Sequence, residues 1–131
     1  MKLTAYGILF ILTGILLFAS CRKDNAQLSP REAAESYYAS LIAGDVDAYM
    51  QGMADYDSLP DDYRSQLRDM FLQYLDGERR QRGGIVSATA LRDTIIDSIL
   101  VHVFLELQFA DSTREEISLP LVRTTSGWRM R

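Results

Sequence analysis

Apolar residues in the first half of the folded region recur every three to four positions, the spacing of helices that bury one face. Ser29 begins the first predicted helix, because Ser-Pro-Arg-Glu combines a capping box with proline at the first helical position. Gly44 ends this helix, and Asp45 caps a short second one. The capping signature of residues 58–61 begins a long third helix, which Gly83 ends. The predicted buried positions are Ala34, Tyr37, Tyr38, Leu41, Ile42, Val46, Tyr49, Met50, Met53, Tyr63, Leu67, Met70, Phe71, Tyr74 and Leu75.

Beyond Gly84 the apolar period changes to two, which is the pattern of strands that bury one face. The strongest alternation is formed by Ile99, Val101, Val103, Leu105, Leu107 and Phe109. Strands are predicted over residues 85–92, 99–109, 117–121 and 128–131. Trp128 is expected to face inward with Met130. Three helices followed by four antiparallel strands predict an α+β domain in which the helices pack on one face of a curved sheet.

The N-terminal segment has a different pattern. Lys2 is followed by an almost continuous apolar stretch, and the small residues Ala19 and Ser20 precede Cys21, the single cysteine of the chain. A charged start, an apolar stretch and small residues before a cleavage point form a secretory signal. The arrangement resembles the lipobox of bacterial lipoproteins, in which the cysteine is acylated and becomes the mature N-terminus. A rival interpretation is an uncleaved transmembrane anchor, because residues 3–20 are near the lower limit for crossing a bilayer.

The lipobox resemblance implies a division of the chain. Residues 1–20 form a signal peptide that is removed, residues 21–28 form an acylated cysteine with a polar tether, and residues 29–131 form the folded domain. Lipid on Cys21, including palmitate, then anchors the protein in the cell envelope of a Gram-negative bacterium. We expect the outer membrane, and the sequence leaves open whether the domain faces the periplasm or the outside.

Composition excludes several classes of function. Lys2 is one of 14 basic residues, and it leaves with the signal peptide, whereas all 18 acidic residues remain. An acidic domain of this kind is a poor partner for nucleic acid. Acylation of Cys21 leaves no thiol for a disulfide, a metal or nucleophilic catalysis. No cofactor is expected, and the length suits a single domain.

Several short segments carry a resemblance to a known superfamily. They are residues 29–34, Gly44-Asp45, residues 83–85 and residues 126–130. Their order resembles small bacterial domains of the nuclear-transport-factor-2-like superfamily, and in particular uncharacterised lipoproteins within it. The resemblance covers residues 29–131 and implies a cone in which a curved sheet wraps a long helix, with a pocket between them. Members include isomerases, dehydratases, ligand carriers and protein-binding modules, so the fold alone does not choose a function.

Aromatic and methionine side chains on the helical faces suggest a ligand pocket between sheet and helices. Tyrosine suits an amphipathic ligand, because it combines an apolar ring with a polar hydroxyl. Packing of the same side chains in the core, with their hydroxyls at the surface, is the alternative. The candidate pocket residues are Tyr37, Tyr38, Tyr49, Met53 and Phe71.

The positions of the residues that could act in catalysis do not favour an enzyme. His102, the single histidine, falls on the strand face opposite the apolar one, where we expect a half-exposed sheet residue. The acids of the strands fall outside the apolar positions. The arginines at residues 79, 80 and 82 are interpreted as a solvated helix end. An acidic cluster lacks the glycine and glutamate of a calcium loop, so no metal is expected. It consists of Asp55, Asp57, Asp61 and Asp62.

Three functions are therefore weighed. The preferred one is a non-catalytic, lipid-anchored module that binds a small amphipathic ligand or an envelope protein. The second is a small enzyme of the isomerase or dehydratase type that uses the pocket. The third is a structural dimerisation domain, in which two copies pair through Leu100, Phe104 and Val122 on the outer sheet face.

Overall fold

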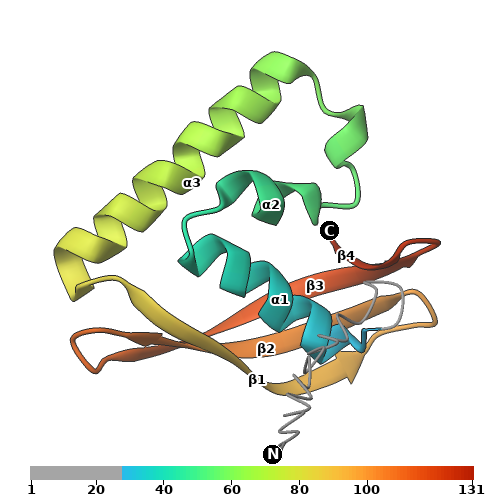
Figure 1. Ribbon diagram of the computed structural model, residues 1–131. Helices are drawn as coiled ribbons and strands as arrows, with labels where there is room; N and C mark the ends of the chain where they lie inside the picture. The colour runs from blue at the N-terminus through green and yellow to red at the C-terminus, as the bar shows by residue number, and fades with distance from the viewer. Residues whose placement is uncertain (1–27) are drawn as a thin grey trace, which may run out of the picture.

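The computed structural model describes residues 28–131. The predicted signal peptide and Cys21 lie outside the described residues, so acylation stays a prediction. The chain order is helices first and strands second (Figure 1). The elements are α1 (Pro30–Ile42), α2 (Val46–Gln51), the 3-10 helix η2 (Tyr56–Ser58), α3 (Asp61–Arg82), β1 (Ile85–Ile95), β2 (Leu100–Phe109), β3 (Arg114–Thr124) and β4 (Gly127–Met130).

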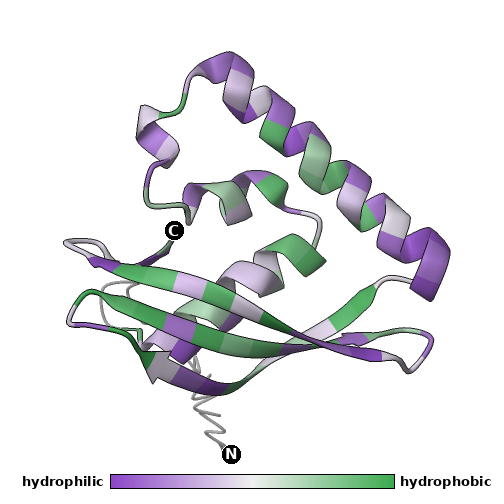
Figure 2. Ribbon diagram, turned by 180° about the vertical axis from the view of Figure 1, so that it is seen from behind, coloured by the Kyte–Doolittle hydropathy of each residue, from purple (hydrophilic) through white to green (hydrophobic). Residues whose placement is uncertain are grey.

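The four strands form one antiparallel sheet in the order β1-β2-β3-β4, so each strand pairs with its neighbour in the chain. In β2 every second residue is buried, from Val101 to Phe109, and the residues between them are half-buried. The helices lie on one side of this sheet (Figure 1). The predicted α+β class and its three helices before four strands are therefore confirmed. Figure 2 shows the apolar stretches along the strands and the mixed polarity of α3.

The first helix lies directly on the sheet. Its start follows the predicted cap, because the Ser29 hydroxyl accepts a hydrogen bond from the Glu32 backbone N–H at 3.2 Å. Ala33 and Ala34 are almost completely buried, and their small side chains let the helix backbone approach the strands closely. Leu41 at the other end is also buried. The short helix α1, rather than the long helix, thus fills the face of the sheet.

The last strand fastens α1 and α2 to the sheet. The Met130 backbone N–H donates to the Gly52 carbonyl at 2.8 Å, and its carbonyl accepts from Ala54 at 2.7 Å. The Tyr37 hydroxyl donates to the Trp128 carbonyl at 2.5 Å. Met130 is buried as expected, but Trp128 is only half-buried. Trp128 therefore packs against the core as predicted, but only in part.

The long helix α3 departs from the predictions at its start. Pro60 occupies the N-cap position and offers no side-chain cap, while Ser58 belongs to the preceding 3-10 turn. The helix begins at Asp61, within the predicted residues 58–61, but the predicted side-chain cap was wrong because Ser58 is part of the 3-10 turn. At the other end Gly83 has φ +81°, the left-handed conformation that glycine adopts without strain.

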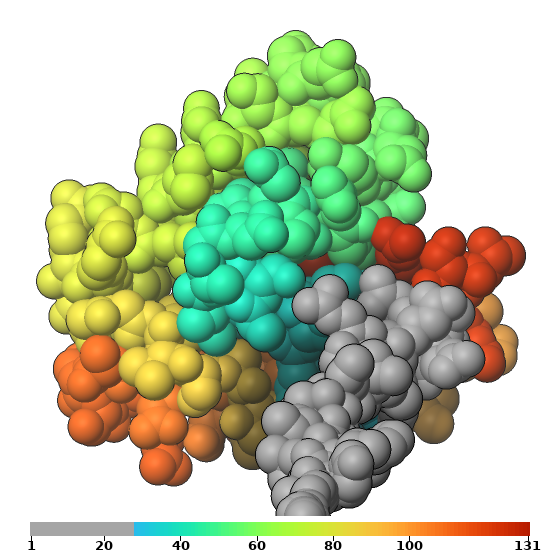
Figure 3. All heavy atoms as spheres, in the orientation of Figure 1, coloured from blue at the N-terminus to red at the C-terminus, as the bar shows by residue number. Residues whose placement is uncertain are grey.

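The packing of α3 also differs from expectation. No residue of this helix is fully buried, and Tyr63 and Met70 are about half exposed. Leu67, Phe71 and Leu75 pack against the core from one side. Because α1 already covers the sheet, α3 rests on α2 and reaches the sheet near β1. Its surface forms the outer edge of the molecule beside α1 and α2 (Figure 3).

Candidate functional site

An apolar pocket of about 280 Å³ opens where α1, α2 and α3 meet. We call it the tyrosine pocket. Each helix contributes to its wall because the buried faces of all three converge here. It is lined by Tyr38, Leu41, Tyr49, Met70, Phe71 and Tyr74. Three other hollows among the described residues lack this concentration of aromatic rings and are lined mainly by polar or small residues.

The aromatic rings of the tyrosine pocket form a continuous edge-to-face series. The Tyr38 and Tyr49 ring centroids are 5.8 Å apart at an interplanar angle of 85°. The Tyr49 and Phe71 centroids are 5.0 Å apart at 76°. Edge-to-face pairs are the favoured arrangement of aromatic rings and add stability beyond the area they bury. The series links the three helices and fixes the wall of the pocket.

The tyrosines supply the polar groups of the pocket lining. The rings of Tyr38 and Tyr49 are in edge-to-face contact, so their phenols are neighbours. Burial raises the pKa of both phenols above the ordinary value of 10. Burial, and after it the negative charge of Glu78, raises the pKa of Tyr74 to about 12. All three phenols are therefore neutral at physiological pH and present hydroxyl groups rather than charges.

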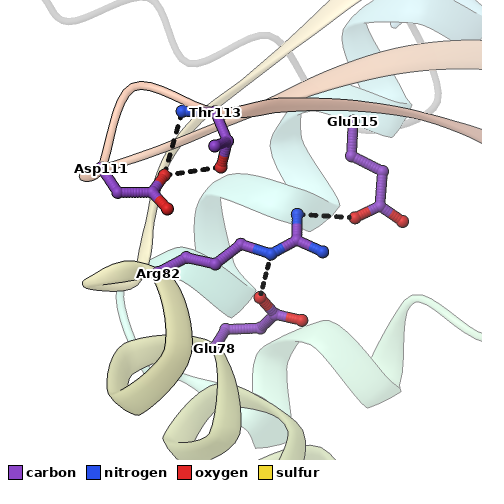
Figure 4. A network of polar contacts seen from close by, with 5 residues as sticks. All are labelled: Glu78, Arg82, Asp111, Thr113 and Glu115. Carbon is purple, nitrogen blue, oxygen red and sulfur yellow. Dashed lines mark hydrogen bonds and ion pairs between the residues drawn. The ribbon is translucent and has the colours of Figure 1, made fainter.

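An ion-pair network lies at the C-terminal end of α3 (Figure 4). Arg82 Nε is 3.5 Å from Glu78 Oε2, and Arg82 Nη1 is 3.1 Å from Glu115 Oε2 on β3. The same guanidinium stacks on the Phe109 ring, 4.3 Å from its centroid. Arg82 thus joins α3 to the sheet and binds the two carboxylates whose charges, after burial, raise the pKa of Tyr74.

The hairpin between β2 and β3 supports this network. The Asp111 backbone N–H donates to the Arg82 carbonyl at 3.0 Å. The Asp111 carboxylate accepts hydrogen bonds from the Thr113 hydroxyl and backbone N–H, which lower the pKa of Asp111 below its ordinary value (Figure 4). The hairpin therefore holds the end of α3, and with it Arg82, in one position.

The structure brings three of the five predicted pocket residues together. Tyr38, Tyr49 and Phe71 line the tyrosine pocket, which lies between helices and not between sheet and helices as expected. Tyr37 lies by a separate, polar hollow, and its hydroxyl is held by the Trp128 carbonyl. Met53 packs on the core and forms an isolated bridge with Met130. Ligand binding by these residues stays a prediction.

Sequence reasoning missed the ion-pair network that joins α3 to β3. Glu115 is paired with Leu107 in the sheet, so it lies on the helix-covered face of β3 two positions before Ile117. An acid therefore continues an apolar alternation, contrary to the expectation that the acids of the strands fall outside it. Arg82 was interpreted as solvated, yet it is bound between two carboxylates. The exposed Arg79 and Arg80 instead pair with Asp76.

The remaining candidates lie away from the pocket. His102 is half-buried on the sheet face opposite the helices, as expected from the alternation. On that outer face Phe104 is covered by the Arg92 guanidinium, 4.4 Å from its ring centroid. Within residues 28–131, no three side chains of histidine, cysteine, aspartate or glutamate come together as a metal site. No helix in that range is both long enough and apolar enough to cross a membrane.

Comparison with known proteins identifies the fold of the chain. No family model matches the chain, and no curated protein matches it. A solved structure, "Putative NTF2-like transpeptidase" from Campylobacter jejuni, is similar with a TM-score of 0.62 and 15% sequence identity. The match covers 79% of this chain and 97% of that one. With its helices on one face of a four-stranded antiparallel sheet, the chain has the nuclear-transport-factor-2-like fold.

Proposed function

We propose that the chain is a lipid-anchored module of the bacterial envelope that binds a small amphipathic ligand in the tyrosine pocket. The observation that carries the proposal is the pocket itself, which has aromatic walls from three helices and three tyrosines in its lining. Ligand sites are typically apolar concavities with a few polar groups that orient the ligand. An acyl or aromatic body on the rings and a hydroxyl or amine that bonds to a phenol fit this arrangement.

The size of the pocket limits the ligand. A volume of about 280 Å³ equals that of about nine water molecules at liquid density. Roughly ten non-hydrogen atoms therefore fill it, which suits a short acyl chain or a single ring system with a polar group. Met70 and Tyr74 are partly exposed at the rim, so a longer ligand extends from the pocket into solvent.

Binding without catalysis is favoured by the kinds of side chain in the pocket. Its lining has no serine, threonine, cysteine, lysine or histidine to act as a nucleophile or base. Catalysis also requires a titratable group within hydrogen-bond reach of the reacting atom. His102 lies on the opposite face of the sheet. Cys21, where acylated, has no free thiol.

One observation favours an enzyme as a second candidate. After burial, the negative charges of Glu78 and Glu115 raise the pKa of the Tyr74 phenol, and proton-transfer enzymes also combine carboxylates with tyrosine hydroxyls. The similar structure from Campylobacter jejuni carries a transpeptidase name. Against this candidate, Arg82 engages both carboxylates. An enzyme of this kind would lose turnover in Glu78→Gln or Glu115→Gln while keeping its ligand.

A pair of tryptophan variants on α3 tests the pocket, with 1-octanol as the probe. Met70 lines the pocket and is 52% exposed, so Met70→Trp fills the pocket without disturbing the core. Leu72 is 39% exposed on the same helix and is not part of the lining, so Leu72→Trp is the matched control. Octanol affinity, measured by NMR titration of the unacylated chain, should fall at least about tenfold in Met70→Trp alone. Equal affinities in the two variants would contradict the proposed pocket.

The anchor is tested separately in cells. Radiolabelled palmitate should enter the wild-type chain and not Cys21→Ser, because the proposed acceptor is the single cysteine. Equal labelling of the two chains would rule out the anchor and leave the pocket proposal to the octanol titration.

A further inference from the structure

Three isoleucines are exposed at the hairpin that joins β1 to β2. Ile95 is 76% exposed, Ile96 52% and Ile99 57%. We call these residues the isoleucine tip. Clustered exposed side chains of this size mark interaction sites more often than single exposed apolar residues do. Their tight turn projects from the end of the sheet (Figure 1).

The tip is held rigidly by its own backbone contacts. Asp97 Oδ1 accepts hydrogen bonds from the backbone N–H groups of Ile99 at 2.8 Å and Leu100 at 2.9 Å. The Ile96 N–H donates to the Leu100 carbonyl at 2.9 Å, and the Ile99 carbonyl accepts from Arg123 at 2.7 Å. These bonds satisfy the N–H groups of Ile96, Ile99 and Leu100, which lowers the cost of moving them into a poorly hydrated environment.

The first turn of α1, where the described chain begins, lies at this same end of the sheet (Figure 1). The described chain begins at Leu28, and Arg31 in the first turn of α1 reaches Asp93 on β1 at 3.3 Å. Asp93 precedes Ile95 by two residues on the same strand face. About seven residues separate Cys21 from the domain, so even fully extended they span at most ~25 Å. A lipid on Cys21 would therefore keep the isoleucine tip close to the bilayer.

The surroundings of the tip suit a membrane surface. Arg123 is exposed beside the tip, and its guanidinium lies 5.8 Å from the centroid of the half-buried Trp128 ring. Tryptophan is enriched at the level of lipid headgroups, and arginine is attracted to anionic lipids. Asp93 is paired with Arg31, which leaves Asp97 as the carboxylate within the turn. That carboxylate limits insertion to the interfacial layer.

We propose that the isoleucine tip inserts into the interfacial layer of the bilayer that holds the lipid anchor, and so orients the domain on the membrane. The inference rests on the proposed acylation of Cys21, which brings the bilayer within reach. A single hairpin tip offers far less than the ~800 Å² per partner that a stable dimer buries, so a second copy fits it less well. In this orientation β2 runs away from the membrane, and the β2–β3 hairpin lies about 30 Å further out.

Site-specific fluorescence in vesicles tests the orientation. The acylated chain carries no free thiol, so Ile96→Cys introduces a single attachment site for an environment-sensitive fluorophore. Ser112→Cys in the exposed β2–β3 hairpin provides the matched control at the other end of β2. The labelled proteins are reconstituted in vesicles of phosphatidylethanolamine and phosphatidylglycerol. Nitroxide-labelled lipid should quench the probe at residue 96 at least about threefold more than the probe at residue 112, and aqueous iodide should show the reverse order.

The outcomes separate this inference from the proposed anchor. Lipid quenching at residue 96 that disappears in Ile95→Ser/Ile99→Ser, while the protein still sediments with vesicles, supports insertion of the tip. Vesicle-bound protein without lipid quenching at residue 96 overturns insertion and leaves the anchor intact. A probe at residue 96 that is protected from both quenchers indicates a protein partner or a second copy, and also overturns it. Failure of palmitate labelling in cells overturns the anchor alone, and lipid quenching at residue 96 in a Cys21→Ser background, where residue 96 again carries the single thiol, would still uphold the tip.

Discussion

Gly52 allows a close approach between α2 and α1, and Gly52→Ala should destabilise the domain. A methyl group at this position would lie 2.4 Å from Tyr37 Cε1 and 3.1 Å from Met130 Cε. Contacts this short force the Tyr37 ring to move. The ring is buried and its hydroxyl is held by the Trp128 carbonyl, so movement also weakens that hydrogen bond.

The expected change in the free energy of unfolding is the sum of one stabilising and two destabilising effects. Gly52 has φ −74° and ψ −9°, so alanine fits its backbone and gains at most about 1 kcal/mol. Overpacking a filled site costs about 1–3 kcal/mol. Loss of the Tyr37 hydrogen bond adds about 0.5–1.5 kcal/mol. The net loss in the free energy of unfolding is about 2 kcal/mol, a large share of the stability of a small domain.

Urea unfolding of the purified protein measures this change, with Gly77→Ala as the matched control. Gly77 lies in α3, and no atom stands within 4 Å of the position a methyl group would take. Alanine there should raise the free energy of unfolding by about 0.5–1 kcal/mol. The two midpoints should thus move in opposite directions. If Gly52→Ala were as stabilising as Gly77→Ala, the Tyr37 ring would not lie against Gly52 and the docking of α1, α2 and β4 described above would be incorrect.

Three further predictions concern single side chains. Burial raises the pKa of Tyr74 to about 12, so the stability that this phenol contributes is present below its unfolded pKa of about 10 and is lost as the pH rises toward 12. In thermal melts, Tyr74→Phe should therefore lose less stability than the wild type between pH 10 and pH 12. An equal loss in the two proteins would contradict burial as the cause. His102→Ala should leave octanol affinity within about twofold, because the side chain lies on the other face of the sheet; a tenfold loss would place His102 in contact with the ligand. Trp128 should emit between buried and free indole and be partly quenched by iodide, since it is half-buried; complete protection would show that β4 packs more deeply than described.

The elements that the sequence predicts well are those with strong local signals. The cap at Ser29 depends on a side chain and backbone three residues apart, and the alternation in β2 depends on neighbours along one strand. Both signals act within a few residues, so they are visible without knowledge of the fold. The start of α3 shows the limit of such signals. Residues 58–61 have a capping sequence, but Ser58 is part of a 3-10 turn and does not cap the helix.

The site could be predicted only in part, since it depends on which helix covers the sheet. The apolar positions of α3 specify a face but not its neighbour. Once α1 occupies the sheet, that face is left partly open and the pocket forms between helices. Glu115 shows the same limit, because its partner Arg82 is 33 residues away and reaches it only through the packing of α3 on the sheet. No periodicity in the strand signals such a pair.

The most direct test of the proposed function is to locate a bound probe by NMR. Nuclear Overhauser effects between the alkyl protons of 1-octanol and aromatic protons of the protein report which rings the ligand touches. The account predicts contacts with the rings of Tyr38, Tyr49 and Phe71, and their loss in Met70→Trp but not in Leu72→Trp. Contacts confined to the hollow beside Tyr37 and Arg129, or no contacts at saturating octanol, would contradict it.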